Sequence, residues 1–351
     1  MKSTQRQGRG WKVGSGLRLP RALLACFAST LFAGVQAQPI LQQTIDLVPG
    51  WNAVYVEVDP PSAALADLFS GLPVDIVAAH SDPVRGAQFV KNRKANLHRA
   101  YGWQVWYSPD RQDAFLSTLF TMQGGTPYLI HARTNVSLTL SGDIAPRRGG
   151  WTPNAYNFVG FSLESPGGPT FHQFFRHSSA HNHNNIYRLV DGTWRQVLQP
   201  ANETMRSGEA FWIYCRGRSD YSGPLDVSTQ IGDGLVLTSR GSGQLVFRNR
   251  TQHPINLWLE HVVSPDVPIP LSIPVTVFEG ESGLRQNEFI HLDGGPFVQP
   301  FPTLEAGQSI RVPLTLRVQD AGPGERYSIL KVVTDLGTQT YIPVTASRDD
   351  L

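Results

Sequence analysis

The sequence predicts a mainly β protein with short helices, built from two tandem β-rich repeat modules and a C-terminal β-sandwich. Three observations predict this class. Of the 351 residues, 40% are hydrophobic, 10% are aromatic and 17% are charged, beside 33 Gly and 26 Pro. This composition excludes a disordered or collagen-like chain and indicates a buried core with many turns. In addition, one pattern of strands and a helix occurs twice in the first two thirds of the chain. The last third consists of short segments, several of which alternate apolar and polar residues, separated by turns.

The first 37 residues predict a secretory signal peptide. Six basic residues precede an apolar run from Ala22 to Val35, and the run ends in a cleavage site after Ala37. Because the run is shorter than the roughly 20 residues that span a bilayer, we expect no transmembrane span after cleavage. Cys26 also lies in a segment that resembles a lipoprotein box, so its lipidation stays an alternative. We therefore expect a secreted, periplasmic or cell-surface protein.

Cleavage changes the charge and the cysteine content. The removed segment carries six of the 30 Lys and Arg and no Asp or Glu, which leaves 24 basic against 28 acidic residues, a net charge of −4. Cys215 becomes the only cysteine, so an internal disulfide is excluded and core burial must stabilise the chain. Because Cys215 lies in an apolar stretch, we expect a buried small hydrophobe rather than a nucleophile.

The repeat begins with an aromatic residue, an Asn and a strand. Gly50 to Val58 corresponds to Ala155 to Leu163, and each segment is followed by a short helix that a Pro starts. Three further strands follow in both copies, and the last of the matched segments runs through Tyr128 in one copy and Phe211 in the other. We expect a first module over residues 38–148 and a second over residues 149–229.

This repeat resembles a module of secreted and surface proteins of bacteria and archaea. Members carry a Gly-Trp-Asn strand, a short helix that ends in Phe, and a closing strand of the type Gly-Tyr/Phe-Trp-Ile. The resemblance covers about residues 44 to 228, and it implies a decorating role with no agreed activity and no functional residue to carry over. The chain departs from the pattern in an insertion from Pro83 to Arg99 and in Pro127-Tyr128-Leu129.

Residues 230–351 predict a β-sandwich, because short strands alternate with turns that contain Gly or Pro. The segments around Leu304 to Val312 and Gly324 to Val332 resemble the end of an immunoglobulin-like domain of bacterial surface proteins, which implies an immunoglobulin-like sandwich with a structural or binding role. The predicted strands are Leu235 to Thr238, Gln244 to Arg248, Ile255 to His261, Ile273 to Phe278, Phe289 to Leu292, Ser309 to Val318, Tyr327 to Thr334 and Thr340 to Ala346.

Four histidines form the most conspicuous polar feature: His172, His177, His181 and His183. Imidazoles at such spacings can capture Zn²⁺ or Cu²⁺. The residues between them are mostly Ser and Asn, which favours a solvated loop over a metal site. We expect no cofactor.

Aromatic side chains offer a second candidate site. Trp106, Tyr107 and Trp151 have no apolar mate in the other repeat copy, so they could be exposed, and a sugar-binding face of such rings is an alternative hypothesis. The other aromatic residues of the repeats are expected to form the core.

Signatures of enzymes are not found. The sequence contains no His-Glu-x-x-His, no Gly-x-Ser-x-Gly, no phosphate-binding loop and no dinucleotide fingerprint. A basic cluster from Lys91 to Arg99 is expected to be a solvated loop or a contact with an anionic polymer, and nucleic-acid binding is not expected at a net charge of −4.

Three functional hypotheses follow. The first is a non-catalytic exported component of a surface, envelope or extracellular assembly, whose partners are other envelope or extracellular proteins. The second is a carbohydrate-binding or adhesive protein that contacts surface polysaccharide, and the third is a hydrolase with a site that the sequence hides.

Overall fold

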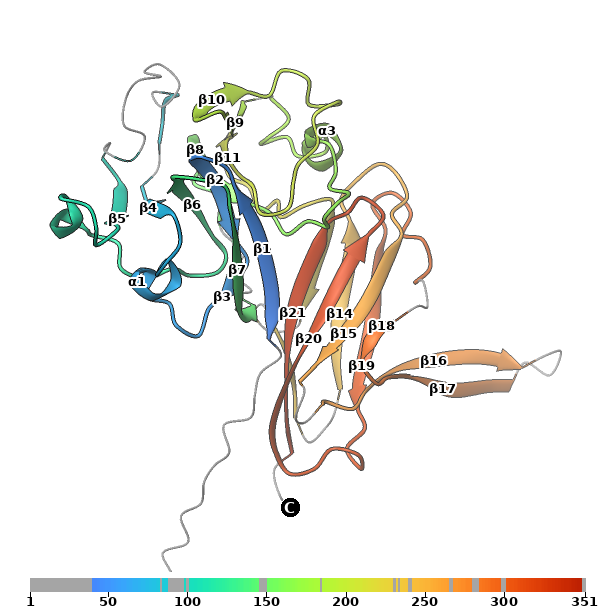
Figure 1. Ribbon diagram of the computed structural model, residues 1–351. Helices are drawn as coiled ribbons and strands as arrows, with labels where there is room; N and C mark the ends of the chain where they lie inside the picture. Colours follow the sequence, from blue (N-terminus) through green and yellow to red (C-terminus); the bar gives the residue numbers. More distant parts are fainter. Residues whose placement is uncertain are drawn as a thin grey trace, which may run out of the picture. The chain divides into compact units, whose positions relative to one another are not determined.

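The computed structural model describes most of the chain from residue 40 onward (Figure 1). Two compact units are distinguished, Met1–Val35 and Gln36–Leu351, and the first lies outside the described residues. The predicted signal peptide, Cys26 and the basic cluster except His98 also lie outside them. The described residues are 40–82, 84–87, 98, 101–144, 150–183, 185–229, 232, 234–238, 242–264, 268–279, 284–297 and 301–348.

The chain is mainly β with short helices, as predicted. The two repeat modules contain two four-stranded antiparallel sheets of the same strand order, β2-β6-β4-β5 and β8-β11-β9-β10. The sequence of strand, helix, strand, strand, strand is therefore present twice. The bounds are β2 (Gly50–Val56), β4 (Val74–His80), β5 (Trp103–Tyr107), β6 (Thr126–Ala132), β8 (Ala155–Gly160), β9 (Ile186–Val190), β10 (Thr193–Gln196) and β11 (Ala210–Cys215).

The asparagine of each repeat fixes the entry of its first strand. Asn52 accepts a hydrogen bond from the Val48 backbone N–H at 3.0 Å and donates to the Val48 carbonyl at 2.8 Å. Asn157 makes the same pair of bonds with Thr152, at 2.8 and 3.1 Å. An Asn side chain supplies both a donor and an acceptor, so it closes the loop as a backbone pair would.

Helices α1 (Leu65–Leu68) and α3 (Phe171–Phe175) follow the first strand of each module. Thr170 caps α3: its hydroxyl accepts from the Gln173 backbone N–H, and the Gln173 side chain accepts from the Thr170 N–H. This capping box satisfies two donors that the helix start leaves open. A short 3-10 helix, η1 (Ala114–Leu116), follows β5.

The first module carries a further small sheet of order β1-β7-β3, in which all pairs are antiparallel. The sheet and α1 bury a core around Val54, Val56 and Trp106. Its strands are β1 (Leu41–Leu47), β3 (Val58–Asp59) and β7 (Val136–Ile144).

The two four-stranded sheets share a core. Successive residues of a strand face opposite sides, so each sheet has an inner and an outer face. Ala53 and Leu129 of the first sheet lie in one buried cluster with Phe158 and Trp212 of the second. On the outer face of the second sheet, Phe211 packs in a separate cluster with the phenylalanines of α3.

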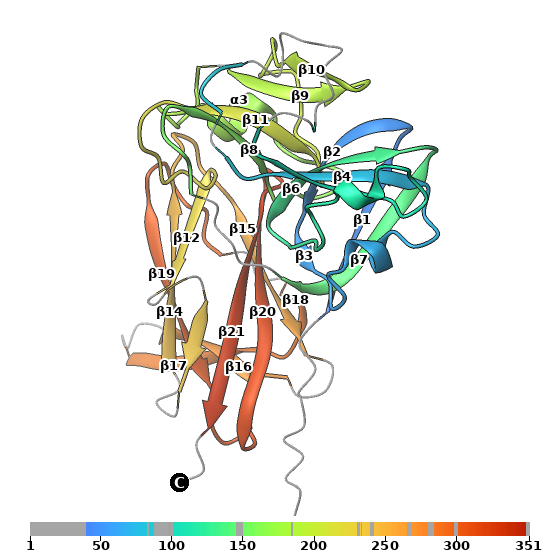
Figure 2. The ribbon, with the colours of Figure 1, turned by 90° about the vertical axis from the view of Figure 1, so that its left-hand side faces the viewer.

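The C-terminal part is a sandwich of two five-stranded sheets, β12-β14-β19-β16-β17 and β13-β21-β20-β15-β18 (Figure 2). Neighbouring strands in the two sheets are antiparallel, except that β13 is parallel to β21. The strands are β12 (Leu225–Thr229), β13 (Leu235–Leu237), β14 (Ser242–Asn249), β15 (Leu257–Val263), β16 (Leu271–Glu279), β17 (Leu284–Leu292), β18 (Gly295–Phe297), β19 (Ser309–Leu316), β20 (Gly324–Thr334) and β21 (Gln339–Arg348).

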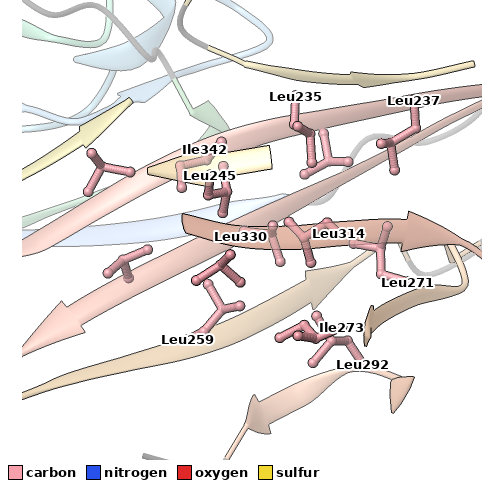
Figure 3. Packing of buried hydrophobic residues seen from close by; sticks show 14 of the residues in the cluster. Leu235, Leu237, Leu245, Leu259, Leu271, Ile273, Leu292, Leu314, Leu330 and Ile342 are labelled. Carbon is pink, nitrogen blue, oxygen red and sulfur yellow. The ribbon is translucent and has the colours of Figure 1, made fainter. Parts of the chain in front are cut away.

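The sandwich core consists mainly of aliphatic side chains from both sheets. Leu245 and Leu314 of one sheet pack with Leu259, Leu330 and Ile342 of the other (Figure 3). All eight predicted segments fall on strands, while β12 and β18 are additional. Because β12 pairs with β14, the sandwich begins at Leu225 rather than at residue 230.

Backbone hydrogen bonds join the modules and the sandwich. The Tyr55 N–H donates to the Gly208 carbonyl at 2.9 Å, which joins the two modules. The Gln339 N–H donates to the Ser162 carbonyl at 3.0 Å, and the Glu164 N–H donates to the Gly337 carbonyl at 2.9 Å. None of the helices in the described ranges combines the length and the hydrophobicity that a bilayer crossing requires.

Candidate functional site

A cavity of about 350 Å³ lies where both modules and the sandwich meet. The first module contributes Tyr55 of β2 and Glu57 just after this strand, the second module contributes Trp151 and Ser162, and β21 contributes Tyr341. The three backbone hydrogen bonds described above, which join the two modules to each other and the second module to the sandwich, hold these residues in place. The cavity therefore belongs to no single module, which is a common place for a binding site.

Equivalent positions of the two repeats meet at this cavity. When Asn52 is aligned with Asn157, Tyr55 corresponds to Gly160 and Glu57 corresponds to Ser162. A Cβ at Gly160 would lie 2.1 Å from Cγ of Tyr55, so the ring packs directly on the glycine backbone. Ser162 is in turn hydrogen-bonded to the Glu57 side chain. The large residues of the first repeat thus fit against the small residues of the second.

Burial makes Glu57 a weak acid. Desolvation raises the pKa of its carboxyl to about 7, although the Ser162 hydrogen bond and the charge of Lys331 act in the opposite direction. The carboxyl is therefore partly protonated near neutral pH and can both donate and accept hydrogen bonds. A carboxyl with such a pKa in a cavity is typical of a functional site.

Burial favours the neutral form of three other groups in the cavity wall, Tyr55, Tyr341 and His80. Burial raises the pKa of Tyr55 and of Tyr341 well above the usual value, and the carboxylate of Glu57 adds to both effects. Burial lowers the pKa of His80, while Asp82 raises it. The two phenols stay protonated over the physiological range, and the Tyr341 hydroxyl donates to Oε1 of Gln339 at 2.8 Å.

The expected exposure of Trp106 and Tyr107 is wrong. Their exposed fractions are 5% and 7%. Both faces of β5 are covered: Trp106 packs against Phe69 near α1, and Tyr107 lies in the core that the two sheets share. Neighbouring residues of a strand point to opposite sides, so a strand between two cores leaves neither ring free.

Trp151 has a different environment. It is half-buried and lines the cavity. Its indole N–H donates to the Tyr221 carbonyl at 2.6 Å, and its ring lies 4.0 Å from the ring of His181 between centroids. These contacts fix the ring in place at the cavity wall. Of the three predicted aromatic residues, Trp151 is thus the one in the candidate site.

The four histidines do not form a metal centre in the described part of the chain, where no three His, Cys, Asp or Glu side chains gather around one point. His181 is buried, its Nδ1 shares a hydrogen bond with the Ser178 hydroxyl at 2.7 Å, and burial lowers its pKa to about 4. His177 instead faces His253, at 6.1 Å between ring centroids. His172 and His183 are exposed. The described part of the chain thus gives no support to the alternative of a metal site at these histidines.

Cys215 is buried and free, as predicted. Its thiol donates to the Gly217 carbonyl at 3.3 Å, and burial raises its pKa. A raised pKa keeps the thiol protonated and unreactive.

The sandwich offers a second candidate feature, a long open edge. Strand β17 ends its sheet and has nine residues, whereas the other edge strands β12, β13 and β18 have five, three and three. Only Leu271 and Ser272 of β16 pair with β19, so most of the β16–β17 hairpin extends beyond the sheet as a two-stranded ribbon (Figure 1). Within the described residues, β17 is paired on one side alone.

Comparisons with known proteins give distant similarities of fold. No protein-family model matches the chain, and no curated protein matches it. The PapD-like domain 7 of human CEP192 is 12% identical over 36% of this chain and 87% of that chain, with a TM-score of 0.23. The E. coli chaperone DraB is 14% identical with a TM-score of 0.23, and the match covers 35% of this chain and about half, 54%, of the chaperone.

The CupB6 tip adhesin from Pseudomonas aeruginosa is 10% identical, with 91% of this chain and 92% of that chain covered and a TM-score of 0.19. At these TM-scores the likenesses assign no function to the chain.

Sequence reasoning missed Glu57 and Tyr341. A signal for Glu57 was present, because it is a lone carboxylate in the apolar strand segment Val54 to Val58. Such a residue is expected to be exposed unless another part of the chain covers it. The covering residues Ser162 and Tyr341 are distant in sequence, so no local pattern pointed to the cavity.

Proposed function

We propose that this protein is a non-catalytic exported component of a surface, envelope or extracellular assembly, and that it binds an extended segment of another protein by strand addition to β17. The open edge of β17 is the observation that carries this proposal. Proteins normally protect a long edge by a proline, a bulge or a cover, because free N–H and C=O groups recruit other strands. β17 contains no proline, and its register with β16 has no shift.

The side chains of β17 support the same function. Phe289 is 54% exposed and lies between Glu288 and Ile290, of which Glu288 is exposed and Ile290 half-buried. In strand addition the backbone provides affinity, and alternate side chains provide specificity. An exposed aromatic residue beside a charge on the edge strand suits a partner strand with an apolar residue.

The resemblance of the repeats to Gly-Trp-Asn modules of surface proteins belongs to the same proposal. It is supported by the matching hydrogen bonds of Asn52 and Asn157, each of which pairs with the backbone N–H and C=O of one residue shortly before its strand. In this proposal the repeats and the sandwich belong to one exported protein, and the partner is another envelope or extracellular protein.

Site-specific photocrosslinking in the native cells tests the proposal. A photoreactive phenylalanine replaces Phe289, and the matched control replaces Trp258, which is 38% exposed on β15, a strand that lies between β18 and β20 in its sheet. We expect a crosslink to one other protein from position 289 and none from position 258. Crosslinks from both positions, from neither, or only to a second copy of the chain contradict the proposal.

Proline substitutions separate edge binding from folding. Along an antiparallel strand the N–H groups face alternately toward the partner strand and away from it. Of Glu288→Pro and Phe289→Pro, one removes a bond to β16 and the other removes a free N–H of the edge. We expect the variant that removes a free N–H of the edge to abolish the crosslink from a probe at His291, while its melting temperature stays close to that of the parent. Retention of that crosslink in both variants rejects strand addition.

A further inference from the structure

The cavity between the modules and the sandwich has the size of a small-molecule site. Its volume of about 350 Å³ lies near the lower end of the range of about 300–1,000 Å³ that ligand pockets show. The cavity is formed by parts of the chain that are hydrogen-bonded to each other. Among its lining residues, the Gln339 backbone N–H donates to the Ser162 carbonyl at 3.0 Å. Thr338, which also lines it, forms a bridge with Leu163 of the second module.

Aromatic rings form the apolar part of the wall. Tyr55, Trp151, Phe161 and Tyr341 are each half-buried and line the cavity. Trp151 is held by its bond to the Tyr221 carbonyl and by the His181 ring behind it. Rigid rings contribute contact area at a small cost in conformational entropy, so they suit a ligand with apolar faces.

Polar groups form the rest of the wall. Ser162, Gln339 and Thr340 offer hydroxyl and amide groups, and Glu57 adds a carboxyl. An anionic ligand is disfavoured, since Glu57 and Asp82 both line the cavity. A cationic ligand is disfavoured as well, because Lys331 already acts on Glu57 with its positive charge. The wall thus combines ring faces with mixed donors and acceptors.

We propose that this cavity binds a neutral polyhydroxylated ligand, one or two sugar rings in size, with Trp151 and Tyr341 against the ring faces and Glu57 and Gln339 toward the hydroxyls. A sugar ring has apolar C–H faces and a rim of hydroxyls that both donate and accept, which matches this wall. The site is independent of β17, so the failure of one proposal leaves the other in place.

Saturation-transfer NMR of the purified chain tests the proposal. The probes are glucose, galactose, mannose, N-acetylglucosamine and the disaccharides formed from them. We expect saturation of the ring C–H protons of at least one probe, and titration calorimetry then gives its affinity. Trp151→Ala truncates the wall and Thr340→Phe fills the cavity, and each is expected to weaken binding by about tenfold or more. Trp258→Ala, which removes an indole elsewhere on the surface, is the matched control and leaves the affinity unchanged.

Two variants keep the test valid if one of them does not fold. Thr340→Phe adds atoms without removing the Trp151 contacts, so it reports on the cavity even where Trp151→Ala fails to fold. Binding that survives Thr340→Phe, binding that Trp258→Ala abolishes, or binding of charged probes alone contradicts the proposal. So does the absence of a signal for every sugar at millimolar concentration. Hydrolysis of a bound disaccharide that Glu57→Gln abolishes would keep the ligand class but overturn the non-catalytic function.

Discussion

The two repeat modules have the same sheet order and the same Asn-stabilised strand entry, but they differ where they touch. The first repeat presents Tyr55 on β2 and Glu57 just after it, and the second presents Gly160 and Ser162 at the equivalent positions. Two large residues facing two equally large ones do not fit, because a Cβ at Gly160 already lies within 2.1 Å of Tyr55. The contact between two similar modules thus depends on their asymmetry, and the same asymmetry places Glu57 at the cavity.

A second difference concerns the strand that follows each sheet. In the first module β7 pairs with β1 and β3 of the same module, whereas in the second β12 pairs with β14 of the sandwich. The first repeat is therefore completed by its own strands, while the second passes its closing strand to the next part of the chain. This connection explains why the sandwich begins before the predicted boundary.

The shared core provides the strongest test of the comparison. Trp212 is 2% exposed and packs with residues of both sheets. We expect Trp212→Ala to lower the free energy of unfolding by about 3–5 kcal/mol, because it leaves a large cavity. Denaturant unfolding followed by circular dichroism measures this change. In Trp258→Ala, where the ring is 38% exposed, we expect a loss below about 1 kcal/mol. Equal losses in the two variants would mean that the sheets do not stabilise each other through this core.

The glycine at the contact between the repeats gives a test of intermediate size. We expect Gly160→Ala to cost about 1–3 kcal/mol, since the new methyl group overlaps Tyr55 and the packing must shift. In a Tyr55→Gly background the same substitution is expected to cost much less, so a double-mutant cycle isolates the contact. Gly150→Ala is the control, because nothing lies within 4 Å of its added Cβ. The same cost in both backgrounds would show that Tyr55 is not the obstacle.

Much of the fold was predictable from sequence, but the site was not. Alternating apolar and polar residues between turns predicted the strands of the sandwich. The matched segments around Asn52 and Asn157 predicted the repeat. Both signals lie in short stretches of sequence. Exposure of Trp106 was mispredicted, since a ring without a counterpart in the other repeat is still buried when two cores enclose its strand. The cavity was missed because Glu57, Ser162 and Tyr341 become neighbours only after three parts of the chain are joined.

The pH dependence of stability tests whether the second repeat buries Glu57. Below the ordinary pKa of 4.5 the carboxyl is protonated in both the folded and the unfolded chain, and its burial costs nothing. Between pH 4.5 and about 7 the unfolded chain loses this proton while the folded chain retains it, so this group lowers stability as pH rises, and the loss levels off above about pH 7. One pKa unit corresponds to about 1.4 kcal/mol, and partial solvent contact reduces the full shift to an expected loss of stability of about 1–2 kcal/mol.

Urea unfolding from pH 4 to 8 measures this loss as the difference between the parent chain and Glu57→Gln, with the exposed Glu305→Gln as control. If Glu57→Gln leaves the pH profile unchanged, the carboxyl is solvated in the folded chain, and the contact with Ser162 does not shield it from water.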